Sequence, residues 1–136
     1  MAMGSIERNK QIVRRLFDAF ADVNLELMDE LVSPQLAVHG LGPAVPADVQ
    51  GWKEVAQHMA QALSDAVWDV NDVIAEQDKV TIRWTLRGLH VGDLFGIPPS
   101  NRGVTVAGIE IYQLVDDKVS EYWGAADLSD LYSADA

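Results

Sequence analysis

The chain has 136 residues, no cysteine, and 10 Lys+Arg against 21 Asp+Glu, which gives a formal net charge of −11. The lack of thiols excludes disulfide frameworks, thiolate zinc sites and cysteine nucleophiles, and the acidic balance argues against nucleic acid or an anionic membrane as a partner. No apolar run is long enough to span a membrane, and no signal peptide is evident. We expect a cytoplasmic, single-domain protein over residues 6–132, with 1–5 as an added or disordered leader and 133–136 as a tail.

The first half of the chain predicts helices. Apolar residues recur every three or four positions from Ile6 to Phe20, which is typical of an amphipathic helix. A second, short helix is expected after Asn24, a good N-cap, and Ser33-Pro34 should end it. A short strand, a Gly/Pro loop and a third helix are expected at residues 35–39, 40–46 and 51–63.

The second half predicts strands. Apolar and polar residues alternate from Lys79 to Leu89, and residues 66–76 form the expected partner strand across a turn at Gln77-Asp78. A second hairpin is expected from residues 104–115 and 118–126 around Asp116-Asp117, whose second aspartate can adopt the left-handed conformation. Helices followed by strands indicate an α+β fold, with a curled antiparallel or mixed sheet wrapped around about three N-terminal helices. An apolar pocket at one end of that sheet is the expected small-molecule site.

Three histidines are available for chemistry. His90 continues the alternation of the strand at 79–89 on the side expected to face inward. It is therefore either an acid/base in the pocket or a histidine at a strand end whose hydrogen bonds are all made within the protein. His39 lies where a strand meets a flexible loop, a common position for a pocket rim. His58 is interpreted as a surface residue of its helix. No histidine pair has metal-ligand spacing with a nearby carboxylate, so no metal site is expected.

Two carboxylates are further candidates. Glu110 lies on the even-numbered face of the strand at 104–115, and both faces are mostly apolar. If the even face is inside, burial would raise the pKa of Glu110 and suit it to general acid/base catalysis; if it is outside, the group is solvated and inert. Asp127 either lines the pocket or is the first polar residue after the last strand.

Residues 90–102 resemble the signature motif of a known family. His90-Val91-Gly92, followed by Phe95-Gly96-Ile97-Pro98-Pro99-Ser100 and Arg102, resembles the H-x-G-x-x-x-G-x-P-P-T-x-R signature of SnoaL-like polyketide cyclases. The resemblance continues through residues 116–119 and Glu121-Tyr122-Trp123, and residues 9–20 look like the opening helix of that family. It implies the cone-shaped α+β barrel shared with ketosteroid isomerase and nuclear transport factor two. It also implies a homodimer or small homo-oligomer that works without metal or cofactor, and an aldol ring closure catalysed by an aspartate.

The sequence departs from the family at that aspartate. The final strand of the family reads H-W-D or H-R-D, whereas this chain has Tyr122, Trp123 and Gly124. Glu110 matches a pocket histidine of the family and Gly108 matches its glutamine. These matched positions are the even ones, so the resemblance implies that Glu110, Tyr112 and Tyr122 face the cavity and that Asp127 lies outside this register unless a bulge intervenes.

The leading hypothesis is a cofactor-free cyclase that closes a ring on a small, apolar, polyketide-derived intermediate of a natural-product pathway. Glu110 is the expected general acid/base; His39 and His90 are expected to support it, and Asp127 is a further candidate. Because the family aspartate is absent, the ring closure need not be an aldol condensation; epoxide-opening ether formation or a pericyclic closure would suit a single carboxylate with a raised pKa. The alternatives are a small hydroxylase, isomerase or epoxide hydrolase, or a non-catalytic ligand-binding module. The aromatic residues expected to shape the cavity are Phe17, Phe20, Trp52, Trp84, Tyr112 and Tyr122.

Overall fold

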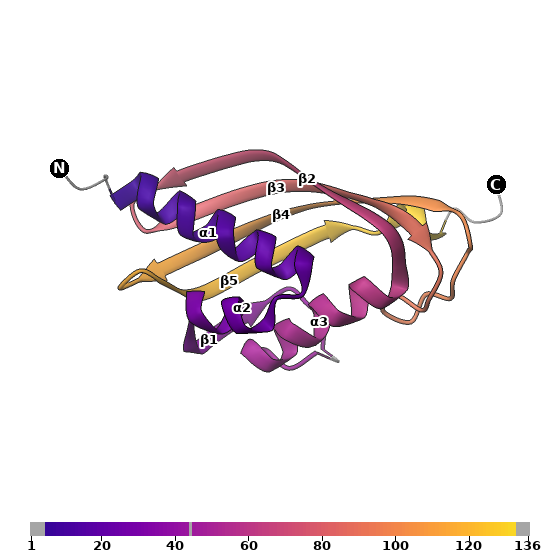
Figure 1. Ribbon diagram of the computed structural model, residues 1–136, viewed down its shortest axis with the longest axis horizontal. Coiled ribbons are helices and arrows are strands. Elements are labelled where there is room, and N and C mark those ends of the chain that lie inside the picture. Colours follow the sequence, from indigo (N-terminus) through magenta and orange to yellow (C-terminus); the bar gives the residue numbers. More distant parts are fainter. Residues whose placement is uncertain (1–4, 44, 133–136) are drawn as a thin grey trace.

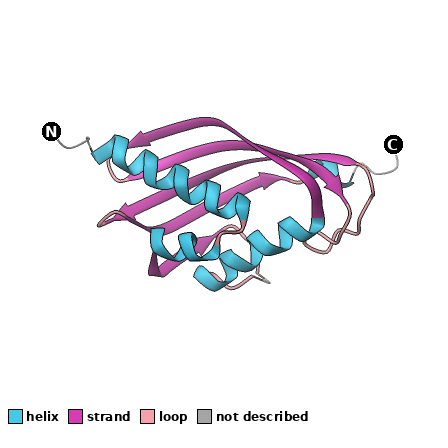
Figure 2. Ribbon diagram, viewed as in Figure 1, coloured by secondary structure: helices cyan, strands magenta, loops and turns pink. Residues whose placement is uncertain are grey.

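The computed structural model describes residues 5–43 and 45–132 and confirms the expected α+β fold. Three helices lie across one face of a curved sheet (Figures 1 and 2). The elements, in chain order, are α1 (Ser5–Asp22), α2 (Leu25–Leu31), β1 (Val32–His39), α3 (Val49–Ala62), β2 (Leu63–Glu76), β3 (Lys79–His90), β4 (Gly103–Val115), β5 (Lys118–Asp127) and the 3-10 helix η1 (Ser129–Tyr132). Ser5, set apart with the leader above, is the first residue of α1; the rest of the leader and the tail lie outside the described residues.

The five strands form one mixed sheet in the order β1-β5-β4-β3-β2. β1 runs parallel to β5, and the other neighbours are antiparallel. β1 begins at Val32, earlier than predicted. Pro34 does not prevent this, because β1 is an edge strand, where a proline costs no ladder hydrogen bond. Asp116 and Asp117 both have positive φ, 53° and 64°, so the turn between β4 and β5 uses the left-handed conformation at both central residues.

The helices are fixed by caps and by one buried face each. The Asn24 side chain accepts a hydrogen bond from Leu27 N at 3.2 Å at the start of α2, as expected of an N-cap. Asp48 does the same for α3 through Gly51 N at 3.0 Å. Val13, Leu16 and Phe17 of α1 are buried against the sheet, each worth about 1.5–3 kcal/mol on burial. In the part of the chain that is described, no helix is both long and apolar enough to cross a membrane.

Candidate functional site

A cavity of about 720 Å³ lies between the helices and the sheet. Its inner wall comes from the strands through Trp84 of β3, Glu110 of β4 and Tyr122 of β5, and α1 contributes Phe17 and Phe20. Loop residues also line it: 40–43 and Val45 after β1, and Asp93, Phe95 and Gly96 after β3; we call this loop part of the lining the mouth. The lining is mostly apolar, with a few polar groups, which is the usual character of a small-molecule site.

Glu110 is the buried carboxylate of this cavity. The buried residues of β4 are the even-numbered ones, and Glu110 among them is 9% exposed. Tyr112 Oη donates a hydrogen bond to Glu110 Oε1 at 2.5 Å, and Tyr122 Oη donates another to Oε2. Burial raises the pKa of Glu110, and hydrogen bonding by Tyr112 and Tyr122 offsets only part of that rise.

The two phenols stay protonated beside that carboxylate. Burial, followed by the charge of Glu110, raises the pKa of Tyr112 and of Tyr122 well above 10. Both hydroxyls are therefore proton donors across the physiological range. A carboxyl group with a raised pKa that exchanges hydrogen bonds with neutral phenols can give a proton to an apolar ligand or take one from it.

Two glycines make room for the side chains around Glu110. Gly124 stands opposite Glu110 in the β4–β5 register, and a Cβ at that position would lie 2.4 Å from Tyr122 Oη. Gly108 stands opposite Trp84 in the β3–β4 register, and a Cβ there would lie 2.2 Å from Trp84 Cζ2. The phenol of Tyr122 and the indole of Trp84 thus fill the space that side chains at these positions would need.

The aromatic residues predicted to shape the cavity fall into two groups. Phe17, Phe20, Trp84 and Tyr122 line it, whereas Trp52 and Tyr112 are buried behind the wall. Trp52 lies with its ring centroid 5.2 Å from that of Phe20 and 5.8 Å from that of Tyr122, so it supports both lining rings.

Trp68 of β2 also lines the cavity, and the sequence analysis missed it. Its ring centroid lies 5.6 Å from Phe17, edge-on, and 5.2 Å from Trp84. β2 contains two register irregularities, after Ser64 and after Val70. Because a bulge breaks the two-residue alternation, strand periodicity could not place this side chain.

His39 and Asp127 lie apart from Glu110. His39 Nε2 hydrogen-bonds with Glu121 Oε2 at 2.8 Å, and its ring stacks on Trp123 with ring centroids 5.5 Å apart. His39 is not a lining residue. Asp127 is exposed, and its Oδ1 accepts a hydrogen bond from Ser129 N at 2.9 Å where η1 begins. Hydrogen bonding to Ser129 holds the pKa of Asp127 below its usual value.

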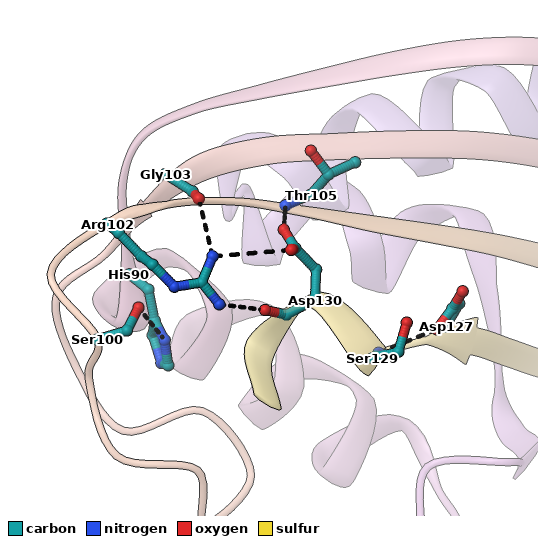
Figure 3. A network of polar contacts seen from close by, with 8 residues as sticks. All are labelled: His90, Ser100, Arg102, Gly103, Thr105, Asp127, Ser129 and Asp130. Carbon is teal, nitrogen blue, oxygen red and sulfur yellow. Dashed lines mark hydrogen bonds and ion pairs between the residues drawn. The ribbon is translucent and has the colours of Figure 1, made fainter. Parts of the chain in front are cut away.

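His90 is fully buried at the base of the loop between β3 and β4 (Figure 3). Its Nδ1 lies 3.3 Å from Ser100 Oγ, and its backbone N–H and carbonyl bond to Arg102 O and Asn101 N. The Arg102 guanidinium in turn donates to the Asp130 carbonyl, and Asp130 Oδ2 accepts from Thr105 N at 2.7 Å (Figure 3). This part of the signature motif therefore closes the loop and connects η1 to β4 through hydrogen bonds. His90 itself does not line the cavity.

His58, interpreted above as a surface residue, lines the cavity mouth. Its Nε2 accepts a hydrogen bond from Phe95 N at 3.1 Å, and the two rings lie 5.4 Å apart. Helical spacing could not reveal this contact, because the loop that covers His58 is 37 residues away in sequence. Across residues 5–43 and 45–132, no three His, Asp or Glu side chains gather in a way that could hold a metal ion.

Comparisons with known proteins agree with this fold. The family profile described as SnoaL-like polyketide cyclase matches residues 10–134. TsrD from Streptomyces laurentii is 25% identical, with a TM-score of 0.82 over 98% of this chain and 97% of TsrD. IdmH from Streptomyces antibioticus, described as a candidate polyketide cyclase, is 25% identical, with a TM-score of 0.77 over 93% and 96%. AclR from Streptomyces galilaeus, described as a candidate hydroxylase, is 23% identical, with a TM-score of 0.78 over 93% and 94%. No curated protein sequence matches the chain.

Proposed function

Because the chain belongs to the SnoaL-like polyketide cyclase family, we propose that it closes a ring on a polyketide-derived intermediate, with Glu110 as the general acid/base and no metal or cofactor. The observation that carries this proposal is the position of Glu110: a buried carboxyl group on the wall of an apolar cavity, with its pKa raised by burial. One group of this kind is worth about 10²–10⁴ in rate.

The cavity supports a role in folding the substrate. Phe17, Phe20 and Trp84 give it flat apolar walls from two sides, and such walls can hold a flexible chain with its reacting atoms close together. Gly124 stands where the family aspartate is expected, so we favour a ring closure that needs one proton donor. In an epoxide-opening ether closure, Glu110 is the source of the proton that the epoxide oxygen takes up as its C–O bond breaks. The attacking hydroxyl forms the new C–O bond and loses its proton, which returns to the carboxylate.

The test is incubation with the linear intermediate of the pathway, followed by liquid chromatography and mass spectrometry, in which the cyclised isomer has a new retention time. Ether closure leaves the mass unchanged, whereas hydroxylation adds an oxygen atom and epoxide hydrolysis adds water. Glu110→Gln should lower the turnover at least about 100-fold. Glu76→Gln, which changes an exposed carboxylate at the end of β2, is the matched control and should keep the turnover. Tight binding of the intermediate without conversion would refute the cyclase and support a binding module.

We also propose that the protein is a homodimer. Ile109 and Ile111 on the outer face of β4 are 51% and 37% exposed, and β4 is the middle strand of the sheet. The ion pairs Arg83–Asp72 and Arg87–Asp69 flank them on β3 and β2. An apolar centre with a polar rim is the usual character of a protein interface. Ile109→Asp should therefore halve the mass measured by light scattering, and a monomeric wild type would refute this assembly.

A further inference from the structure

Both carboxylate oxygens of Glu110 already have hydrogen-bond partners. Tyr112 Oη donates to Oε1 and Tyr122 Oη donates to Oε2. Each carboxylate oxygen keeps a second lone pair, and Glu110 lines the cavity, so a ligand can exchange a proton with it either directly or through one of the phenols.

The two phenols differ in their access to the cavity. Tyr122 is one of the lining residues, whereas Tyr112 is 1% exposed and is not among them. The Tyr112 hydroxyl thus reaches Glu110 from behind the wall. Tyr122 and Glu110 both line the cavity, so the Tyr122 hydroxyl meets the carboxylate at the cavity wall.

Gly124 adds an independent observation. It also lines the cavity, and a Cβ on it would lie 2.4 Å from Tyr122 Oη and 2.9 Å from Cζ. The Tyr122 hydroxyl consequently occupies the space that a side chain at position 124 would take, directly opposite Glu110 in the register of β4 and β5. Only glycine at this position leaves the hydroxyl both in contact with Glu110 and beside the cavity.

We propose that the Tyr122 hydroxyl is the catalytic group that touches the substrate and passes protons between it and Glu110, and that Tyr112 is a positioning residue. In the acid direction, Tyr122 gives its proton to an acceptor oxygen of the substrate and takes one from the protonated Glu110 carboxyl, which becomes a carboxylate. The base direction is the reverse. The substrate is then an apolar molecule with a carbonyl, epoxide or hydroxyl oxygen at its reacting end. This inference rests on the proposed function in placing the chemistry at Glu110.

A pair of matched ligands tests the contact without the natural substrate. 2-Naphthol and naphthalene differ by one hydroxyl group, and their affinities can be measured by ligand fluorescence for the wild type, Tyr122→Phe and Tyr112→Phe. We expect the wild type to prefer 2-naphthol about tenfold, the value of one good hydrogen bond. Tyr112→Phe should keep this preference, and Tyr122→Phe should reduce it to less than about twofold. Equal preferences in both variants would overturn the proposal, as would a preference that only Glu110→Gln abolishes.

Two further measurements separate this role from a structural one. Gly124→Ala keeps the tyrosine but crowds its hydroxyl, so it should also abolish the preference if Tyr122→Phe does not fold. Tyr112→Phe removes a hydrogen bond that lowers the pKa of Glu110, so the infrared carbonyl band of the protonated carboxyl should persist to higher pH than in the wild type. An unchanged band would overturn the positioning role. A naphthol preference that depends on Tyr122, in a protein that converts no linear intermediate, would support the contact and refute the cyclase.

Discussion

Replacing Gly124 with alanine should separate Tyr122 from Glu110. The added methyl group would lie 2.4 Å from Tyr122 Oη, far inside van der Waals contact, and the backbone of β5 is held between β1 and β4. The end of the tyrosine side chain is the part that can move. Its hydroxyl would leave Glu110 Oε2, which then keeps no hydrogen-bond donor in a buried site.

The size of the effect follows from two opposing contributions. A buried acceptor that loses its partner costs about 1–3 kcal/mol, and replacing a strand glycine by alanine returns about 0.5–1 kcal/mol. The net loss in the free energy of unfolding should be about 1.3 kcal/mol. With a urea m-value of about 1–3 kcal/mol/M, the unfolding midpoint should fall by about 0.4–1.3 M.

Equilibrium unfolding in urea measures this loss, and Gly103→Ala is the matched control. A Cβ at Gly103, a strand glycine of β4, meets no atom within 4 Å, so this variant should be as stable as the wild type or slightly more stable. The substitution at Gly124 should cost less in a Tyr122→Phe background, because the hydroxyl is already gone. If Gly124→Ala behaved like Gly103→Ala, the inferred position of the Tyr122 hydroxyl would be wrong.

Three further predictions concern stability. The raised pKa of Glu110 means that the folded protein holds this proton more tightly than the unfolded chain, so its stabilising contribution is lost as the pH rises through the raised pKa. The melting temperature of Glu110→Gln minus that of the wild type should therefore increase as the pH is raised above the ordinary titration range of a glutamate, and a constant difference would contradict the assignment. Gly108→Ala should cost about 1–3 kcal/mol by overpacking against Trp84 and alter the near-UV circular dichroism; wild-type stability would show that the indole can move away freely. Asp48→Ala should cost about 1 kcal/mol in urea unfolding by removing the cap on Gly51 N, whereas Asp48→Asn should not.

The elements that local patterns define were predicted well. Alternation along Lys79–His90 and the cap residue Asn24 led to β3 and to the start of α2, and the structure confirms both. Their signals depend on neighbours a few residues away, which the sequence displays directly.

The candidate site depends on contacts that no local pattern records. Periodicity left the inner face of β4 open, and only the family resemblance selected the even-numbered residues that the structure buries. His58 reaches the cavity through a loop distant in sequence, and Trp68 follows a bulge. The hydrogen bonds of Tyr112 and Tyr122 to Glu110 depend on side-chain direction within a shared face, which spacing alone cannot determine.

The entrance and the carboxylate come from different kinds of structure. Glu110 and Tyr122 are held by the ladder between two paired strands, whereas the mouth consists of residues 40–43, Val45, Asp93, Phe95 and Gly96. Surface connections tolerate insertions and exchanges far better than strands do. Changes in these two loops, made by design or during evolution, can therefore alter the size and shape of the molecule that the cavity accepts. Glu110 and Tyr122 would keep their positions, because the strands that hold them are unchanged.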